Sequence, residues 1–181
     1  PGSATINPDG TYESPKYLAG TRVVLTEVIP TDTSSVHWAT PKFIPTDAAG
    51  APIEGAEPTD SLEITFSTSN NNLGKISYFG LTNEATLQQA PFEASKKIVN
   101  ADDVDLSGIT EYTLNYSYPE GDAWPAGSGE LVLPADGTVV QSAPLPIGAV
   151  LTLSEATPSA VTGAEWGIPV ISPETLTISE D

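Results

Sequence analysis

Residues 17–45 read YLAGTRVVLTEVIPTDTSSVHWATPKFIP, and residues 145–173 read LPIGAVLTLSEATPSAVTGAEWGIPVISP. The two stretches align without a gap at a constant offset of 128 residues and share seven identities in 29 positions, among them one Trp and one Glu. Internal repetition is stronger evidence about architecture than a single short motif. We therefore interpret the chain as consecutive copies of one β-rich module.

The composition favours strands over helices. The 181 residues include 17 Pro and 15 Gly, which disfavour long helices, and Thr, Val, Ile and Tyr cluster in short stretches between turn residues. This pattern is typical of β-sandwiches. We predict an all-β protein of two tandem Ig-like or prealbumin-like sandwich modules, at residues 1–88 and 89–181.

Each predicted module lacks a part that the other one has. Residues 92–118 have no counterpart in the first copy, and residues 74–83 have none in the second. The first module thus lacks its opening strands and the second lacks its closing strand. Open sheet edges are a liability because their backbone groups can pair with other chains. We expect neighbouring repeats or identical subunits as partners.

Individual strands are expected where apolar and polar residues alternate between turn signals. They are residues 2–6, 21–29, 62–67, 74–83, 92–99, 112–118, 129–133 and 176–179, with further strands opening at Trp38 and Trp166. Residues 84–91 form the only stretch that permits a helix, and we interpret them as the linker between the modules.

Charge and composition exclude several classes of function. Six Lys and Arg against 24 Asp and Glu give a net charge of −18, which argues against nucleic acid or an anionic membrane as partner. No apolar run reaches the length of a membrane span. The absence of Cys excludes disulfides and thiolate metal sites, and the single His nearly excludes His-based catalytic triads. We expect no cofactor, no metal and no enzyme activity on an external substrate.

A glutamate stands among apolar residues in both copies. In the first copy Val23, Leu25 and Glu27 share one face of the expected strand, and Glu155 takes the same place in the second copy. A buried carboxylate is costly unless it is paired. The repeated placement suggests a function for both carboxylates. A glutamate half-exposed at a sheet edge remains the alternative.

A lysine and an asparagine complete this pattern. Lys96 lies on the strand predicted to open a module, and Asn83 ends the strand predicted to close one. With Glu27 or Glu155 between them, these residues resemble the collagen-adhesin B-type (CnaB-like) domains of Gram-positive surface proteins and pilins. The pattern LTE…W…P also resembles the tandem repeats of large actinobacterial cell-surface proteins.

The resemblance implies an autocatalytic isopeptide bond between a first-strand Lys and a last-strand Asn, promoted by the Glu. Chemically, a dry core favours the neutral amine of a lysine, which can attack a carboxamide and expel ammonia. The resemblance assigns Glu27 and Glu155 as promoting residues and Lys96 and Asn83 as crosslinked ones. Lys97 is the alternative to Lys96, because a slip of one residue in strand register exchanges their faces.

Two other candidate sites remain open. The acidic loop 100–108 could supply oxygen ligands to calcium, although a solvated loop explains its charge equally well. Trp124 with Tyr116 and Tyr118 could form a platform for sugar rings, but the same aromatics could belong to the core.

The hypothesis for function is structural. We expect a stalk or repeat segment of a bacterial adhesin or pilus-like protein, located outside the cell and attached to its surface or wall. The alternatives are an adhesin module that binds a glycan or a host protein, and a filament subunit completed by strand addition from a neighbour.

Overall fold

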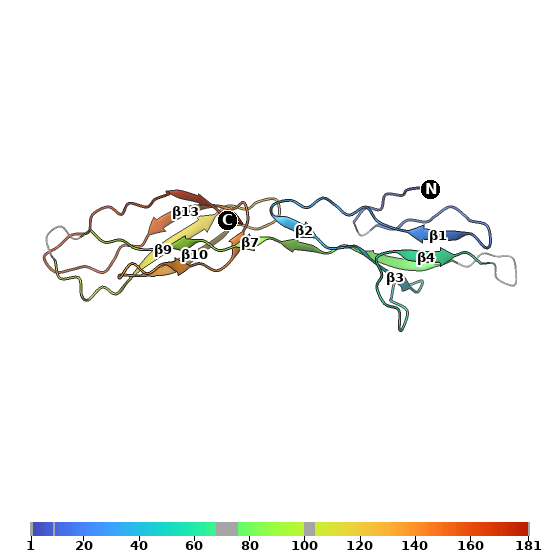
Figure 1. Ribbon diagram of the computed structural model, residues 1–181, viewed down its shortest axis with the longest axis horizontal. Helices are drawn as coiled ribbons and strands as arrows, with labels where there is room; N and C mark the ends of the chain where they lie inside the picture. The colour runs from blue at the N-terminus through green and yellow to red at the C-terminus, as the bar shows by residue number, and fades with distance from the viewer. Residues whose placement is uncertain (1, 9, 68–75, 100–103, 181) are drawn as a thin grey trace. The chain divides into compact units, whose positions relative to one another are not determined.

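The structure is a computed structural model that describes residues 2–8, 10–67, 76–99 and 104–180 (Figure 1). These residues form only strands, turns and loops, and all the strand pairs are antiparallel. The predicted all-β, sandwich-like fold is thus confirmed. The described ranges contain no helix that could cross a membrane.

The chain divides into two compact units. Unit 1 comprises Pro1–Ile29 and Ala39–Glu84, and unit 2 comprises Pro30–Trp38 and Ala85–Asp181. The sequence placed the change of module at residues 88/89. The structural units change four residues earlier, after Glu84, and segment 30–38 belongs to unit 2.

Unit 1 contains two strand pairs. β1 (Arg22–Leu25) pairs with β4 (Leu62–Thr65), and β3 (Lys42–Thr46) pairs with β5 (Tyr78–Thr82). Phe43 is the only large apolar side chain that is fully buried in the described part of this unit. Unit 1 therefore has a small core.

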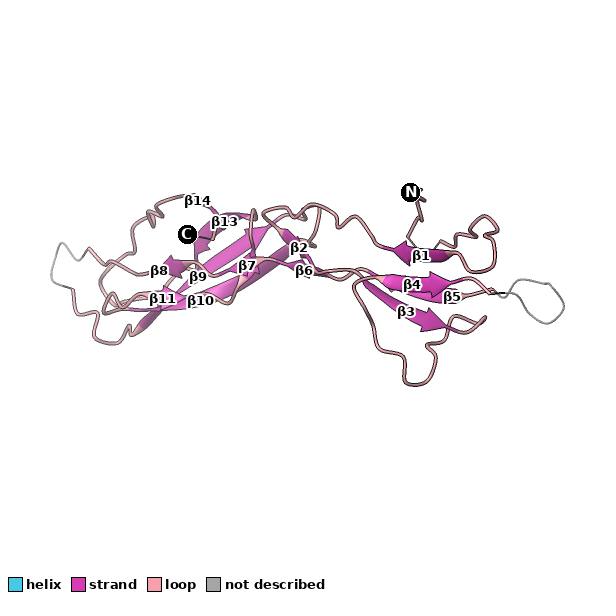
Figure 2. Cartoon of the chain, turned by 45° about the vertical axis from the view of Figure 1, so that its right-hand side comes forward, coloured by secondary structure: helices cyan, strands magenta, loops and turns pink. Residues whose placement is uncertain are grey.

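Unit 2 contains a four-stranded sheet in the order β10-β9-β13-β14 (Figure 2) and three short strand pairs, β2–β6, β7–β12 and β8–β11. The bounds of its strands are β2 (Val36–Trp38), β6 (Ala85–Leu87), β7 (Gln89–Ala90), β8 (Glu93–Ala94), β9 (Glu111–Tyr118), β10 (Gly127–Pro134), β11 (Val140–Gln141), β12 (Leu145–Pro146), β13 (Val150–Glu155) and β14 (Thr175–Thr177).

The core of unit 2 is one cluster of apolar side chains contributed by the four-stranded sheet and by the segments around the short pairs. Its buried members are Phe92, Leu114, Leu131, Leu133, Leu145, Ile147, Ala149, Leu151 and Ile178. Alternation along β9, β10 and β13 sends every second side chain into this cluster. Burial of this apolar surface is the main stabilising contribution to unit 2.

Residues 84–91, which the sequence suggested as a linker, contain the short strands β6 and β7. β6 pairs with β2, and β7 pairs with β12. The Ser35 hydroxyl also donates a hydrogen bond of 2.9 Å to the Ile147 carbonyl, and the Gln88 amide donates one of 2.8 Å to the Ser35 carbonyl. Segment 30–38 is therefore anchored within unit 2 by backbone pairing, which local sequence does not reveal.

Several predicted strands are shorter than expected or absent. Residues 2–6 form no strand, because no described segment pairs with them. Trp38 ends β2 and does not open a strand, and residues 166–169 form none. The strand predicted at 92–99 shortens to β8. Residues 74 and 75 of the strand predicted at 74–83 lie outside the described residues.

The two copies of the repeated stretch share their local backbone geometry around Gly20 and Gly148 and in the strand that follows each glycine. Gly20 and Gly148 both have positive φ angles, 85° and 91°, which glycine adopts without strain. The Gly20 amide donates to the Phe66 carbonyl at 2.8 Å, and the Gly148 amide donates to the Ile178 carbonyl at 2.9 Å. The adjoining strand pairs have the same register, with Val23 opposite Ile64 and Leu151 opposite Leu176.

Leu151 and its counterpart Val23 should contribute unequally to stability. Leu151 is 0% exposed, whereas Val23 is only half-buried. Leu151→Ala is expected to lower the free energy of unfolding of unit 2 by about 2–5 kcal/mol, because it leaves a cavity in the core. All three Trp residues belong to unit 2, so denaturant unfolding followed by Trp fluorescence measures this loss. The control is Val150→Ala, because Val150 lies on the same strand of unit 2 and is 47% exposed. An equal loss from Val150→Ala would contradict the assigned core.

Candidate functional site

A partly buried ion pair joins Lys96 and Glu155 in unit 2. Lys96 follows β8, and Glu155 is the last residue of β13. The Lys96 Nζ lies 2.7 Å from both carboxylate oxygens of Glu155. The two side chains are 21% and 10% exposed. Burial removes water from both charges, which costs free energy. The contact between the ammonium and both carboxylate oxygens offsets much of this cost.

Strand alternation positions both members of this pair. Lys96 lies on the same side of its segment as Phe92 and Ala94, which face the core, whereas Lys97 is exposed. Glu155 follows Leu151 and Leu153 at the same spacing along β13. The structure therefore brings Lys96, and not Lys97, to the carboxylate.

The ring of Tyr112 forms one wall of the pair. The Lys96 Nζ lies 4.8 Å from the centre of this ring, close enough for a cation–π interaction. Trp166 also contacts Tyr112 edge-to-face, with ring centres 6.0 Å apart. Burial, and secondarily the negative charge of Glu155, raise the pKa of Tyr112 above its ordinary value. The surroundings of the ammonium are thus mainly apolar and aromatic.

A second polar contact joins Glu27 and Asn83 in unit 1. Glu27 follows β1, and Asn83 follows β5. The Asn83 side-chain amide donates a hydrogen bond of 2.9 Å to Oε1 of Glu27. The other carboxylate oxygen of Glu27, Oε2, is buried and has no hydrogen-bond partner among the described residues. Such an oxygen is costly to leave unpaired.

The two glutamates occupy matching positions, 128 residues apart, but hold different partners. Glu155 binds an amine and Glu27 binds a carboxamide. Within the described ranges no lysine bonds to Glu27, and no asparagine bonds to Glu155. Lys96 and Asn83 are therefore not partners of one another in the contacts of either unit. The sequence pattern combined a lysine, a glutamate and an asparagine. Unit 1 brings together the glutamate and the asparagine, and unit 2 brings together the glutamate and the lysine.

The Lys96–Glu155 contact holds an amine and a carboxyl group in direct hydrogen-bond contact. At 2.7 Å, movement of one proton from the ammonium to the carboxylate produces a neutral amine beside a carboxylic acid. The neutral amine is a nucleophile, and the acid can protonate a leaving group. An amine and a carboxyl group are two of the groups that amide formation with a carboxamide requires.

The aromatic residues considered as a sugar platform pack against the protein. A Cβ atom at Gly127 would lie 2.4 Å from the Tyr118 ring, and one at Gly129 would lie 2.3 Å from the Tyr116 hydroxyl. These rings therefore cover glycines of the neighbouring strand β10. Trp124 also packs against the core of unit 2. In this arrangement the three aromatic side chains pack against other residues of unit 2.

The acidic loop at 100–108 is described only in part. Residues 100–103, which include Asp102 and Asp103 of the suggested calcium site, lie outside the described residues. Asp105 accepts a hydrogen bond of 3.0 Å from the Ser107 backbone amide. The described part of the chain contains no group of three or more His, Asp or Glu side chains arranged to hold a metal.

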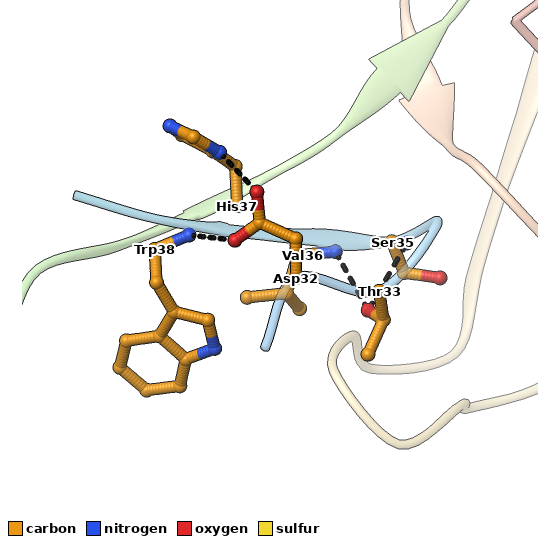
Figure 3. A network of polar contacts seen from close by, with 6 residues as sticks. All are labelled: Asp32, Thr33, Ser35, Val36, His37 and Trp38. Carbon is orange, nitrogen blue, oxygen red and sulfur yellow. Dashed lines mark hydrogen bonds and ion pairs between the residues drawn. The ribbon is translucent and has the colours of Figure 1, made fainter. Parts of the chain in front are cut away.

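An aspartate that the sequence did not single out organises segment 30–38 (Figure 3). Asp32 accepts hydrogen bonds from the Trp38 amide at 2.8 Å and from Nδ1 of His37 at 2.7 Å. The Thr33 hydroxyl accepts one of 3.0 Å from the Val36 amide. The local sequence TDTSS is typical of such side-chain-capped turns. His37 is exposed, and the network shapes the turn before β2.

Protonation of Asp32 should loosen this turn. The hydrogen bond from the Trp38 amide, and then the one from His37, lower the pKa of Asp32 below its ordinary value of 3.8. A carboxyl with a depressed pKa in the folded state stabilises the turn above the unfolded pKa, and this contribution disappears as the pH falls through the folded pKa. In an NMR titration we expect the Asp32 carboxyl and the Trp38 amide to share a midpoint below 3.8.

His37→Ala is the matched variant for this titration. It should move the Asp32 midpoint only part of the way back, because the larger effect comes from the Trp38 amide. A midpoint at or above the ordinary pKa in the unsubstituted chain would contradict the network.

Lys96 and Lys97 should differ sharply in their effect on stability. Lys96→Ala leaves a buried, unpaired carboxylate and is expected to lower the free energy of unfolding of unit 2 by about 3 kcal/mol. Lys97→Ala, at an exposed position, should change it by less than about 0.5 kcal/mol. Combining Lys96→Met with Glu155→Leu should recover most of the loss. Equal effects of the two alanine variants in denaturant unfolding would contradict the pair.

Part of the chain matches a known family model. Residues 92–181 match a family model described as "Domain of unknown function (DUF5979)". The matched stretch contains both Lys96 and Glu155 and neither Glu27 nor Asn83. No curated protein and no solved structure matches the chain.

Proposed function

We propose that the chain is a structural segment of a bacterial cell-surface protein of adhesin or pilus type, with modules braced by amide bonds between lysine and asparagine side chains. The observation that carries this proposal is the division of partners between the matching residues Glu27 and Glu155. One glutamate holds the Asn83 carboxamide and the other holds the Lys96 amine. A module with both partners would contain every group that amide formation requires.

The reaction uses groups of the chain alone. Proton transfer from Lys96 to Glu155 gives the neutral amine, which attacks Cγ of an asparagine placed beside it. The new amide C–N bond forms as the bond to the asparagine side-chain nitrogen breaks. That nitrogen leaves as ammonia and takes up the proton that Glu155 holds, so ammonium is released and the carboxylate is restored. Proximity in a dry site replaces an external energy source.

The proposed bond suits a segment that carries load. It would join the opening strand of a module to its closing strand, so that pulling on the ends could not separate them. The chain contains no Cys, so a disulfide cannot do this. Its net charge of −18 favours solubility at an exposed surface. We place the segment outside the cell, attached to its surface or wall, with neighbouring modules or identical subunits as partners.

A second candidate function is a filament subunit completed by a strand from a neighbouring chain. The observation that favours it is segment 164–174 of unit 2, which forms no strand. The part of the matching segment that lies in unit 1, residues 39–46, contains β3, which pairs with β5. The two candidates share the same chemistry and differ in the origin of the closing strand.

An extended chain tests the amide bond. Residues 76–84 are appended after Asp181 through a flexible Gly/Ser linker, so that unit 2 receives its own asparagine. We expect an intact mass one ammonia below that of the sequence, and a branched peptide that joins Lys96 to the added asparagine. Lys96→Ala or Glu155→Gln should abolish the loss, and Lys97→Ala should not. A folded extended chain of full mass would contradict the proposed bond.

A further inference from the structure

Unit 2 has an open edge beside its ion pair. Segment 164–174 contains Trp166 and leads into β14. It pairs with no described strand. Two of its apolar side chains, Ile168 and Val170, are 95% and 93% exposed. Next to it lies a groove of about 350 Å³, lined by Thr152, Leu153, Pro169, Ile171, Glu174 and Thr175. Apolar groups and unpaired backbone are thus open to solvent along one edge.

Unit 1 shows what covers the matching place. The offset of 128 residues aligns Ile171 with Phe43 of β3. Phe43 is buried, and its ring lies 5.9 Å from that of Phe79 on β5. β5 pairs with the whole of β3, from Lys42 opposite Thr82 to Thr46 opposite Tyr78. The edge that is open in unit 2 is therefore occupied by a strand in unit 1.

The sequence of β5 is suited to this position. Phe79, Leu81 and Asn83 are spaced by two residues and share one face of the strand. Phe79 contacts the buried Phe43, and Asn83 reaches Glu27. A strand docked in the same register on unit 2 would place its apolar side chains along Ile171 and the groove. Its asparagine would lie beside Glu155, which is the counterpart of Glu27.

We propose that the edge formed by residues 164–174 of unit 2 is the docking site for an extended strand with the chemistry of β5. The strand presents apolar side chains at alternate positions on one face, followed on that face by an asparagine. Backbone pairing with the open segment provides the affinity, and the groove selects the apolar side chains. The asparagine approaches Lys96 and Glu155, and its reaction there rests on the proposed function.

A peptide added to the intact chain tests the docking. The probe has the sequence of residues 76–84, ISYFGLTNE, with both ends capped. In NMR spectra we expect shifts of the backbone amides of residues 168–174 upon addition of the peptide. Leu81→Asp in the peptide places a charge against the groove and should weaken binding by about tenfold or more. Tyr78→Ala alters the opposite face and should change the affinity by less than about threefold.

Two further measurements distinguish docking of the peptide from formation of the amide bond. The Asn83→Ala peptide should still shift residues 168–174, because docking does not require the carboxamide. The unsubstituted peptide should also add its mass, less one ammonia, to Lys96. Docking without this mass change would support the docking site and count against the proposed function. Absence of shifts at residues 168–174, or equal shifts with the Leu81→Asp peptide, would overturn the docking site.

Discussion

A carboxylate on the apolar face of a strand needs a partner, and this constraint shapes both units. Both carboxylate oxygens of Glu155 contact the ammonium of Lys96, which also lies over the ring of Tyr112. Glu27 meets this constraint only in part, because Asn83 bonds to one oxygen and the other has no partner among the described residues. The same residue in the same local geometry thus has a complete pair in one unit and an incomplete one in the other.

Sequence alone predicted the parts that depend on alternation and repetition. The alternation of apolar and polar residues gave the all-β fold, and the repeat pointed to Glu27 and Glu155 as equivalent residues. The sequence left Lys96 and Lys97 as alternatives, and the structure places Lys96 on the core-facing side and leaves Lys97 exposed. These features follow from the two-residue period of a strand, which a sequence displays directly.

The remaining features depend on partners that are distant in the chain. Residues 84–91 become strands because β2 and β12 lie beside them, and a short segment carries no signal of that pairing. The same reason explains why residues 2–6 and 166–169 form no strand despite favourable composition. The Asp32 turn was missed for a different reason, since one aspartate among several Ser and Thr residues does not reveal which amides it will accept from.

The pairing of Lys96 with Glu155 is the central claim, and NMR of the lysine side chains tests it most directly. A lysine ammonium held between a carboxylate and an aromatic ring exchanges its protons slowly with water and lies near the ring protons. We predict that Lys96 alone gives such a signal, with cross-peaks to Tyr112, and that Glu155→Gln weakens it. A Lys96 signal that exchanges as fast as that of exposed Lys97, without contacts to Tyr112, would contradict the account.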